Sequence, residues 1–265
     1  MLPSAVSDSR VHNILPNRID TDFQFSRASA ATRVNHQGLI ENVGYFSDEL
    51  VRNGNFSELG PELITNGDFA TDSDWNKGVG WSINNGKAIY QGSTNANLKQ
   101  NSVLVSGKTH KLVFEVTSNT SNSNLKLAGE TVSGGLSVPE TVGVHTVYFV
   151  NNGTGTNFAF RVTGNTTGVL EIDNVSVKQV DPDDDWNLGG CWSFGDNVAL
   201  SDGTGNDSIT QAISLPAGKL RIKFDIITRT QGSVRLFINK PAFTQLLNVS
   251  EIGSYEINVD TTSGS

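Results

Sequence analysis

All four tryptophans of this chain lie in two copies of one short motif. Residues 74–83 and 185–194 both read D-W-N-x-G-x-x-W-S-apolar and are 111 positions apart. An indole ring can close a hydrophobic core, or it can stack on the apolar face of a bound molecule. The second tryptophan keeps its register in both copies, which favours the core. The first follows a polar stretch, so both roles stay open for it. The four candidate binding residues are Trp75, Trp81, Trp186 and Trp192.

Side chains that could perform catalysis are scattered. The four histidines, His12, His36, His110 and His145, form no H-E-x-x-H arrangement, and the chain has no G-x-S-x-G elbow. Cys191 is the single cysteine, which excludes an intrachain disulfide and a cysteine-based zinc site. The sequence does not exclude a carboxylate pair for glycosidic cleavage, but acids are common in any acidic chain. We therefore expect a protein that is not an enzyme.

The composition of the chain limits the kinds of partner that it could bind. The net charge is −8 and the sequence pI is about 4.9, with no basic stripe, so a nucleic-acid partner is not expected. No apolar run approaches the ~20 residues of a membrane-spanning helix, so we expect no membrane insertion. The N-terminus lacks the charged start and apolar block of a signal peptide. These features indicate a soluble protein that would reach an extracellular site without an N-terminal signal.

The motif belongs to a longer repeat. Residues 111–116 match 221–226, and residues 143–149 match 253–259, both at a spacing of 110. A repeat of this length is the size of a domain rather than of a solenoid unit. Short runs rich in β-branched and aromatic residues alternate with Gly- and Asn-rich breakers, and sustained helical periodicity is missing. The sequence therefore predicts an all-β protein built from tandem sandwiches.

The repeat also sets the expected domain limits. We expect an extended N-terminal segment at 1–60, a first module at 61–180 and a second at 181–265. A local duplication pairs L-V-R-N-G-N-F at 50–56 with L-I-T-N-G-D-F at 63–69. The acidic run at 181–185 reads as a solvated linker. The second copy has no equivalent of the last two strands of the first, which predicts either a longer protein or a sheet completed by another chain.

Three stretches resemble the jelly-roll carbohydrate-binding modules of the galactose-binding-like superfamily. They are L-I-T-N-G-D-F at 63–69, the two tryptophans that follow, and I-D-N-V-S-V at 172–177. The resemblance implies tandem jelly rolls whose exposed aromatic rings stack on sugars. The glycan candidates are then Trp75, Trp81, Tyr90, Trp186 and Trp192, with Tyr148 a weaker one. Core packing is the alternative for each of them.

The same resemblance implies a structural calcium where the first and last strands meet. Its carboxylate ligands would be Asp68 and Asp173. Members of the family commonly have an acid directly after the Phe of N-G-D-F, and here that position is Ala70. The departure favours the alternative, in which both aspartates make turn hydrogen bonds. No other cofactor is expected.

The segment F-S-R-A-S-A-A-T-R-V-N-x-x-G-L-I-E at 25–41 resembles a stretch found near the start of tailed-phage virion proteins. The resemblance implies a virion surface protein, such as a head decoration, head fibre or tail-associated protein, anchored on capsid or tail proteins. Strand addition would dock the segment. The docking residues are Phe25, Arg27, Arg33, Leu39 and Ile40.

The function expected from these features is a non-enzymatic virion surface protein whose jelly rolls bind cell-surface glycans. A homotrimer would fit such a role, although the sequence has no coiled-coil heptads. One alternative is the glycan-binding module of a secreted polysaccharide-degrading enzyme. Another is a purely structural spacer.

Overall fold

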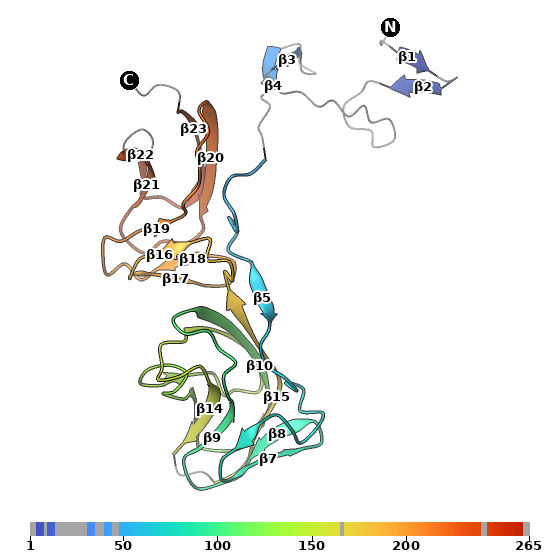
Figure 1. Cartoon of the computed structure of the whole chain (residues 1–265), viewed down its shortest axis with the longest axis vertical. Coiled ribbons are helices and arrows are strands. Elements are labelled where there is room, and N and C mark those ends of the chain that lie inside the picture. Colours follow the sequence, from blue (N-terminus) through green and yellow to red (C-terminus); the bar gives the residue numbers. More distant parts are fainter. Residues whose placement is uncertain are drawn as a thin grey trace. The chain divides into compact units, whose positions relative to one another are not determined.

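The computed structural model describes residues 48–164, 167–239 and 243–261, and the backbone of four short strands nearer the N-terminus (Figure 1). Every regular element among these residues is a β-strand, and the strands form several antiparallel sheets. The predicted all-β class, with β-sandwich and jelly-roll folds, is therefore confirmed. Contacts divide the chain into two units, Met1–Glu49 and Leu50–Ser265.

The first unit contains two antiparallel hairpins. Strand β1 (Ser4–Ser7) pairs with β2 (Arg10–Asn13), and β3 (Ala31–Val34) pairs with β4 (Ile40–Val43). Strands of four residues present too little apolar surface for a core of their own. The unit therefore contains short β-elements, as the sequence predicts.

Module 1, which we define as residues 59–180, is a sandwich of two sheets. In the first sheet the order is β13-β10-β15-β8-β7, and β5 also pairs with β15. In the second sheet the order is β12-β11-β14-β9-β6. The strands of the first sheet are β5 (Leu59–Glu62), β7 (Trp81–Asn84), β8 (Lys87–Tyr90), β10 (Thr109–Asn119), β13 (Gly143–Val150) and β15 (Leu170–Val180). The strands of the second are β6 (Asn76–Lys77), β9 (Ala96–Gln100), β11 (Asn124–Leu127), β12 (Leu136–Ser137) and β14 (Phe158–Thr163).

Alternation along the strands produces the core of module 1. In β10 every second side chain is buried, and Leu112, Phe114 and Val116 have no exposed surface. The long strand β15 adds Leu170 and Ile172 to the same core. Successive side chains of a strand point to opposite faces, so the residues between them lie on the outer face of the sheet. That outer face is where a ligand could reach module 1.

Module 2, which we define as residues 181–261, contains four separate strand pairs: β16-β19, β17-β18, β20-β23 and β21-β22. The strands are β16 (Asn187–Leu188), β17 (Trp192–Phe194), β18 (Ala199–Ser201), β19 (Ile209–Thr210), β20 (Lys219–Ile226), β21 (Val234–Asn239), β22 (Phe243–Val249) and β23 (Gly253–Asp260). In three of the four pairs the register repeats that of module 1, and in β21-β22 it repeats at Leu236 and Leu247 before a bulge shifts it. For example, Trp81 faces Tyr90 in module 1, and Trp192 faces Ser201 in module 2.

We call residues 50–58 the leading segment. This segment contacts Trp186 of module 2 in the same way that residues 63–69 contact Trp75 of module 1. The Trp75 indole donates to the carbonyl of Asn66 at 2.9 Å, and the Trp186 indole donates to the carbonyl of Asn53 at 3.0 Å. The phenylalanine three positions after each asparagine packs on the same indole. The ring centroids of Phe69 and Trp75 are 5.2 Å apart, and so are those of Phe56 and Trp186. The two copies of the local duplication therefore make the same contacts with two different modules.

A second pair of contacts supports this equivalence. The Gln100 side chain donates to the carbonyl of Thr65 at 2.6 Å and accepts from its amide at 3.2 Å. Gln211 makes the same two hydrogen bonds to Arg52, each at 2.8 Å. By these contacts the leading segment goes with module 2. The predicted limit at residue 60 grouped it instead with the N-terminal segment, because sequence proximity hides a contact that skips more than 120 residues.

Candidate binding face of module 1

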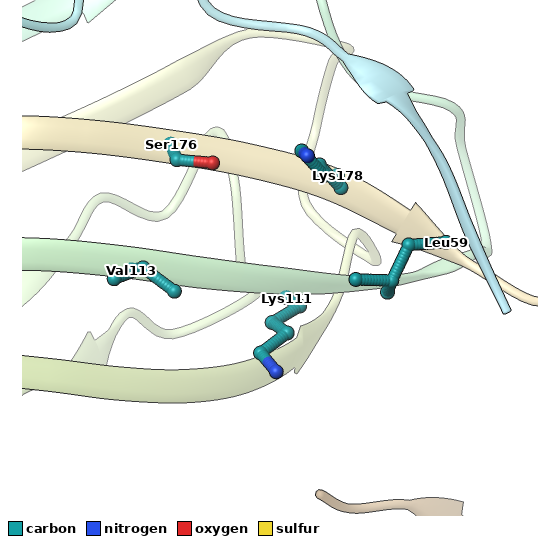
Figure 2. A pocket seen from close by; sticks show the side chains of 5 residues that line it. All are labelled: Leu59, Lys111, Val113, Ser176 and Lys178. Atoms are coloured by element: carbon teal, nitrogen blue, oxygen red, sulfur yellow. The ribbon is translucent and has the colours of Figure 1, made fainter. Parts of the chain in front are cut away.

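A shallow groove lies on the outer face of the first sheet. Lys111 and Val113 of β10 line it together with Ser176 and Lys178 of β15, and Leu59 of β5 closes one end (Figure 2). Its volume is about 220 Å³. The two strands are paired, so that Lys111 lies directly opposite Lys178 and Val113 opposite Ser176. The groove therefore has two lysines on paired strands, and their amines point in different directions (Figure 2).

The row of residues continues into the neighbouring strand. Tyr148 of β13 lies opposite Lys111, whose Nζ is 5.5 Å from the centre of the tyrosine ring. The Tyr148 hydroxyl donates to Asp196 of module 2 at 3.0 Å, and Lys111 pairs with the same carboxylate at 3.1 Å. The row Tyr148, Lys111 and Lys178, which we call the basic row, thus combines a half-buried aromatic ring with two cations.

Charge distribution makes the basic row attractive to anions. The hydrogen bond with Tyr148, then that with Asp196, raises the pKa of Lys111. The hydrogen bond from Lys111 lowers the pKa of Asp196. Lys178 has no ion-pair partner among the residues that the structure describes. Asp196 already compensates the charge of Lys111, so Lys178 is the cation of the basic row that an anion could pair with.

The tryptophans of module 1 do not contribute to this face. Trp75 and Trp81 are each only 6% exposed, and Tyr90 is fully buried. Trp81 packs against Tyr90 with ring centroids 5.2 Å apart. A ring that is enclosed on both faces cannot stack on a sugar, so the expectation of glycan stacking is wrong for these three residues. Core packing, the alternative weighed for them, is what the structure shows.

In module 2 the tryptophans are half-buried, and each indole nitrogen is occupied. Trp186 donates to Asn53, and Trp192 donates to the carbonyl of Asp207 at 3.1 Å. Trp186 and Phe194 line a second depression of about 200 Å³ together with Lys108 and Asp184. Of the aromatic residues predicted to bind glycans, Trp186 thus lines this second depression and is partly exposed.

The two aspartates predicted to hold calcium make turn hydrogen bonds instead. Asp68 accepts from the amide of Ala70 at 3.3 Å, and Asp173 accepts from the amide of Asn174 at 2.7 Å. Burial, then the neighbouring Glu115, raises the pKa of Asp173. Within the described ranges these aspartates belong to no group of three close metal-ligating side chains. Both aspartates thus make the turn hydrogen bonds of the alternative, and the calcium site stays a prediction.

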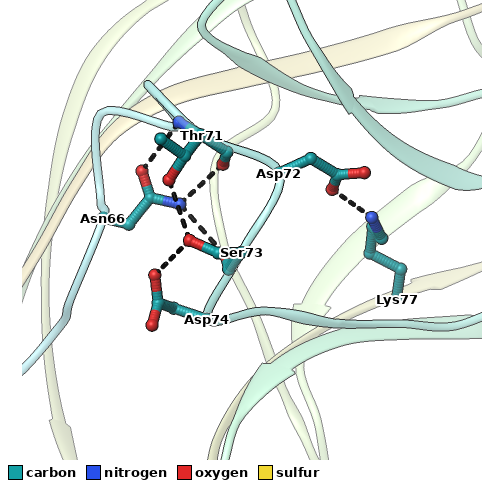
Figure 3. Close-up of polar contacts among 6 residues, drawn as sticks. All are labelled: Asn66, Thr71, Asp72, Ser73, Asp74 and Lys77. Atoms are coloured by element: carbon teal, nitrogen blue, oxygen red, sulfur yellow. Dashed lines mark hydrogen bonds and ion pairs between the residues drawn. The ribbon is translucent and has the colours of Figure 1, made fainter.

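Asn66, next to Asp68 in the chain, closes the loop after the first strand. Its amide nitrogen donates to the carbonyls of Thr71 and Ser73, and its oxygen accepts from the amide of Thr71 (Figure 3). Asn66 has a φ of 52°, in the left-handed region that asparagine tolerates better than most residues. These bonds fix the conformation of the loop before Trp75.

The acidic run at 181–185 is not simply a solvated linker, because Asp181 is 3% exposed and Asp185 8%. With Glu58 they form a group of three carboxylates whose oxygens lie within 4.8 Å of one another. Asp181 accepts from the Asn53 side chain at 2.7 Å and from the Trp186 amide at 2.9 Å. Asp185 forms an ion pair with Arg52 at 2.7 Å. Protein donors thus satisfy Asp181, whereas Asp185 Oδ1 is buried and contacts Arg52 without a hydrogen bond of normal geometry. The cluster ties the leading segment to module 2.

The predicted docking residues cannot be compared with the structure at the level of side chains. Phe25, Arg27 and Leu39 lie outside the described residues. Arg33 and Ile40 belong to the paired strands β3 and β4, where Arg33 is opposite Glu41. The docking role therefore stays a prediction.

The strongest shift of pKa that the structure shows belongs to a residue of the core. His110 has no exposed surface, and burial lowers its pKa to about 4. Its Nδ1 lies 3.0 Å from the carbonyl of Lys108, and its ring stacks on Phe149 at 5.4 Å. Perturbed groups are candidates for catalysis when they lie in a cleft. His110 is instead enclosed in the core, where its ring packs on Phe149.

No protein-family model matches this sequence, and a search of curated proteins finds no match. The described part of the chain contains no helix that is long and apolar enough to cross a membrane. One similar solved structure is the enzymatically active domain of tailspike protein 4 of bacteriophage CBA120, with 16% identity and a TM-score of 0.32. The alignment covers 45% of this chain and 21% of that one, so the chain spans about a fifth of its length. Another is a CBM4 structure, with 18% identity, a TM-score of 0.29, and coverage of 49% and 99%.

Proposed function

We propose that this protein is a non-enzymatic surface protein of a phage virion and that module 1 binds acidic glycans along the basic row. The observation that carries the glycan part is the pair Lys111 and Lys178, placed opposite each other on an open sheet face. The carboxylate of a uronic or sialic acid would pair with the Lys178 amine, next to Lys111. Tyr148 would contact the apolar face of the sugar ring.

Two features support this reading over a spacer that binds nothing. A spacer gains nothing from Lys178, a cation on the outer sheet face for which the described residues supply no ion-pair partner. Moreover, the groove beside the pair is lined by Val113 and Leu59, which supply apolar surface next to the charges. Ligand sites commonly combine apolar walls with a few polar groups that fix orientation.

The virion part of the proposal rests on the resemblance of residues 25–41 to the start of tailed-phage virion proteins. In this role the N-terminal segment attaches to capsid or tail proteins, and modules 1 and 2 face outward. The glycan would then belong to the surface of the host cell.

A glycan array that carries matched neutral and acidic oligosaccharides tests the proposal on the whole chain. We expect binding to acidic members only. Lys178→Ala should weaken that binding about tenfold or more, because a hydrogen bond to a charged group contributes roughly 1.5–3 kcal/mol. Lys126→Ala, on strand β11 of the other sheet, is the matched control and should leave binding unchanged.

Two results would contradict the proposal. One is the absence of binding to any acidic glycan at millimolar concentration, which would favour the spacer. The other is equal binding of neutral and acidic glycans that Lys178→Ala does not change, which would move the site away from the basic row.

A further inference from the structure

Module 2 repeats the strand pairs of module 1 with a spacing of 110 or 111 residues. Lys126 faces Ser137 in module 1, and Leu236 faces Leu247 in module 2, each 110 positions later. The spacing is also 110 for the pair β10-β13 and its counterpart β20-β23. It is 111 for β6-β9 and β16-β19, and for β7-β8 and β17-β18. Each strand pair of module 2 therefore has a defined counterpart in a complete sandwich.

The counterparts show which positions lie between the pairs. In module 1, β15 lies between β10 and β8, and β14 lies between β11 and β9. These two central strands join the four pairs into two sheets. In the described part of module 2, no strand lies between β20 and β18 or between β21 and β19, so the pairs stay separate. Strands β18, β19, β20 and β21 thus each have one backbone edge at the position where module 1 has a central strand.

The apolar faces of module 2 show the same difference. Phe114 and Leu112 of β10 are fully buried, whereas their counterparts Phe224 and Ile222 in β20 are only half-buried. Phe243 of β22 is 72% exposed and stacks on Phe237 at 4.6 Å. In module 1 the corresponding surface is covered by the apolar side chains of β14 and β15, all of them buried: Phe158, Phe160, Val162, Leu170, Ile172, Val175 and Val177.

A glycine in the leading segment gives independent support. In module 1 the amide of Val175 donates to the carbonyl of Gly67 at 2.8 Å, and a Cβ on Gly67 would collide with the carbonyl oxygen of Val175. Gly67 is thus required by the close passage of β15. Its counterpart Gly54 has only the Val51 side chain nearby, at 3.3 Å. Gly54 thus leaves the space that a strand equivalent to β15 would need. Among the described residues no strand occupies that space.

We propose that module 2 is a strand acceptor that binds two further β-strands of polypeptide. One strand is antiparallel to β20 and β18, and it passes Gly54 as β15 passes Gly67. The other is antiparallel to β21 and β19. The occupant is a polypeptide segment with the pattern of Phe158 to Val180, in which aliphatic and aromatic residues alternate with polar ones. Main-chain hydrogen bonds supply affinity, and the half-buried apolar faces supply selectivity.

The probe is a synthetic peptide with the sequence of residues 158–180, added to the whole chain. Hydrogen–deuterium exchange then reports on the backbone amides of β18 and β20. We expect at least about tenfold slower exchange in both strands on saturation, as expected for newly paired amides. The control peptide carries Ile172→Asp and Val177→Asp and should give no protection, because two charges would enter the core.

Gly54→Ala is the discriminating variant. The added methyl group meets only the Val51 side chain in the chain itself, so the circular dichroism spectrum should not change. It should nevertheless weaken peptide binding at least about tenfold, because the methyl group obstructs the strand (about 1.4 kcal/mol per factor of ten). Full affinity in Gly54→Ala, or unprotected amides in wild-type β18 and β20 at saturating peptide, would overturn the proposal. So would a dimer of the chain without peptide that protects the same amides, because the occupant would then be a second copy.

Discussion

His110 should make the stability of module 1 depend on pH between about 4 and 6.5. Burial lowers the folded-state pKa of this histidine to about 4, whereas an unfolded histidine titrates near 6.5. The folded pKa is the lower one, so the unfolded chain binds the proton first as the pH falls. The contribution is complete above about pH 6.5 and is lost progressively down to pH 4. A difference of about 2.5 pH units corresponds to about 3 kcal/mol of unfolding free energy.

Urea unfolding of the whole chain at several pH values from about 4 to 7.5 measures this loss. At each urea concentration a short pulse of deuterium, always at the same pH, labels the amides of unfolded molecules. The deuterium content of the proteolytic fragment that contains β10 then reports the unfolded fraction of module 1. Other carboxylates titrate in the same range, so the informative quantity is the difference between wild type and His110→Gln. Glutamine keeps a donor for the Lys108 carbonyl but carries no titratable group. The variant should be less stable at pH 7.5, and most of the deficit should vanish at pH 4. A deficit that is constant with pH would refute the assignment of a buried neutral histidine.

The remaining predictions concern the start of module 1. Phe69→Ala should destabilise module 1 by about 3–5 kcal/mol, because the ring is 1% exposed and packs on Trp75; urea unfolding measures the loss, and a change below 1 kcal/mol would contradict the packing. Gly67→Ala should prevent stable folding of module 1, while Gly54→Ala should not change the melting temperature; equal effects of the two would contradict the difference in strand contacts. Chelation with EDTA should leave the melting temperature unchanged, because Asp68 and Asp173 make turn hydrogen bonds; a fall of several degrees would restore a calcium site.

The repeat in the sequence predicted the strand register well. The spacing of 110–111 residues, read from the tryptophan motif and two apolar runs, recurs in every strand pair of module 2. Alternation alone identifies the buried face of β10, because side chains of a strand alternate strictly between the two faces. Which strands pair with one another is harder to predict from the sequence. The alternation of residues within one strand does not show which strand lies next to it.

The leading segment shows how such pairing escapes a reading along the chain. The duplication of 50–56 and 63–69 was visible, but the predicted limit at residue 60 assigned the first copy to the N-terminal segment. The structure joins them to separate tryptophans, Trp186 and Trp75. The missed signal was that two copies of the first-strand motif precede two copies of the tryptophan motif.

The functional residues were the least accessible to sequence. The motif drew attention to Trp75 and Trp81, which the fold encloses, because burial depends on both faces of a ring. Lys111 and Lys178 drew none, since they are 67 positions apart and become neighbours only through the β10-β15 register. A lysine pair of this kind has no local sequence signature.

The most direct test of the account is the affinity of the whole chain for an acidic oligosaccharide, measured by calorimetry for wild type and Lys178→Ala at low and physiological salt. The account predicts binding that weakens with salt, as expected for exposed charges. It also predicts a loss of about tenfold or more in Lys178→Ala. Binding that depends on neither salt nor Lys178, or no heat of binding at all, would contradict it.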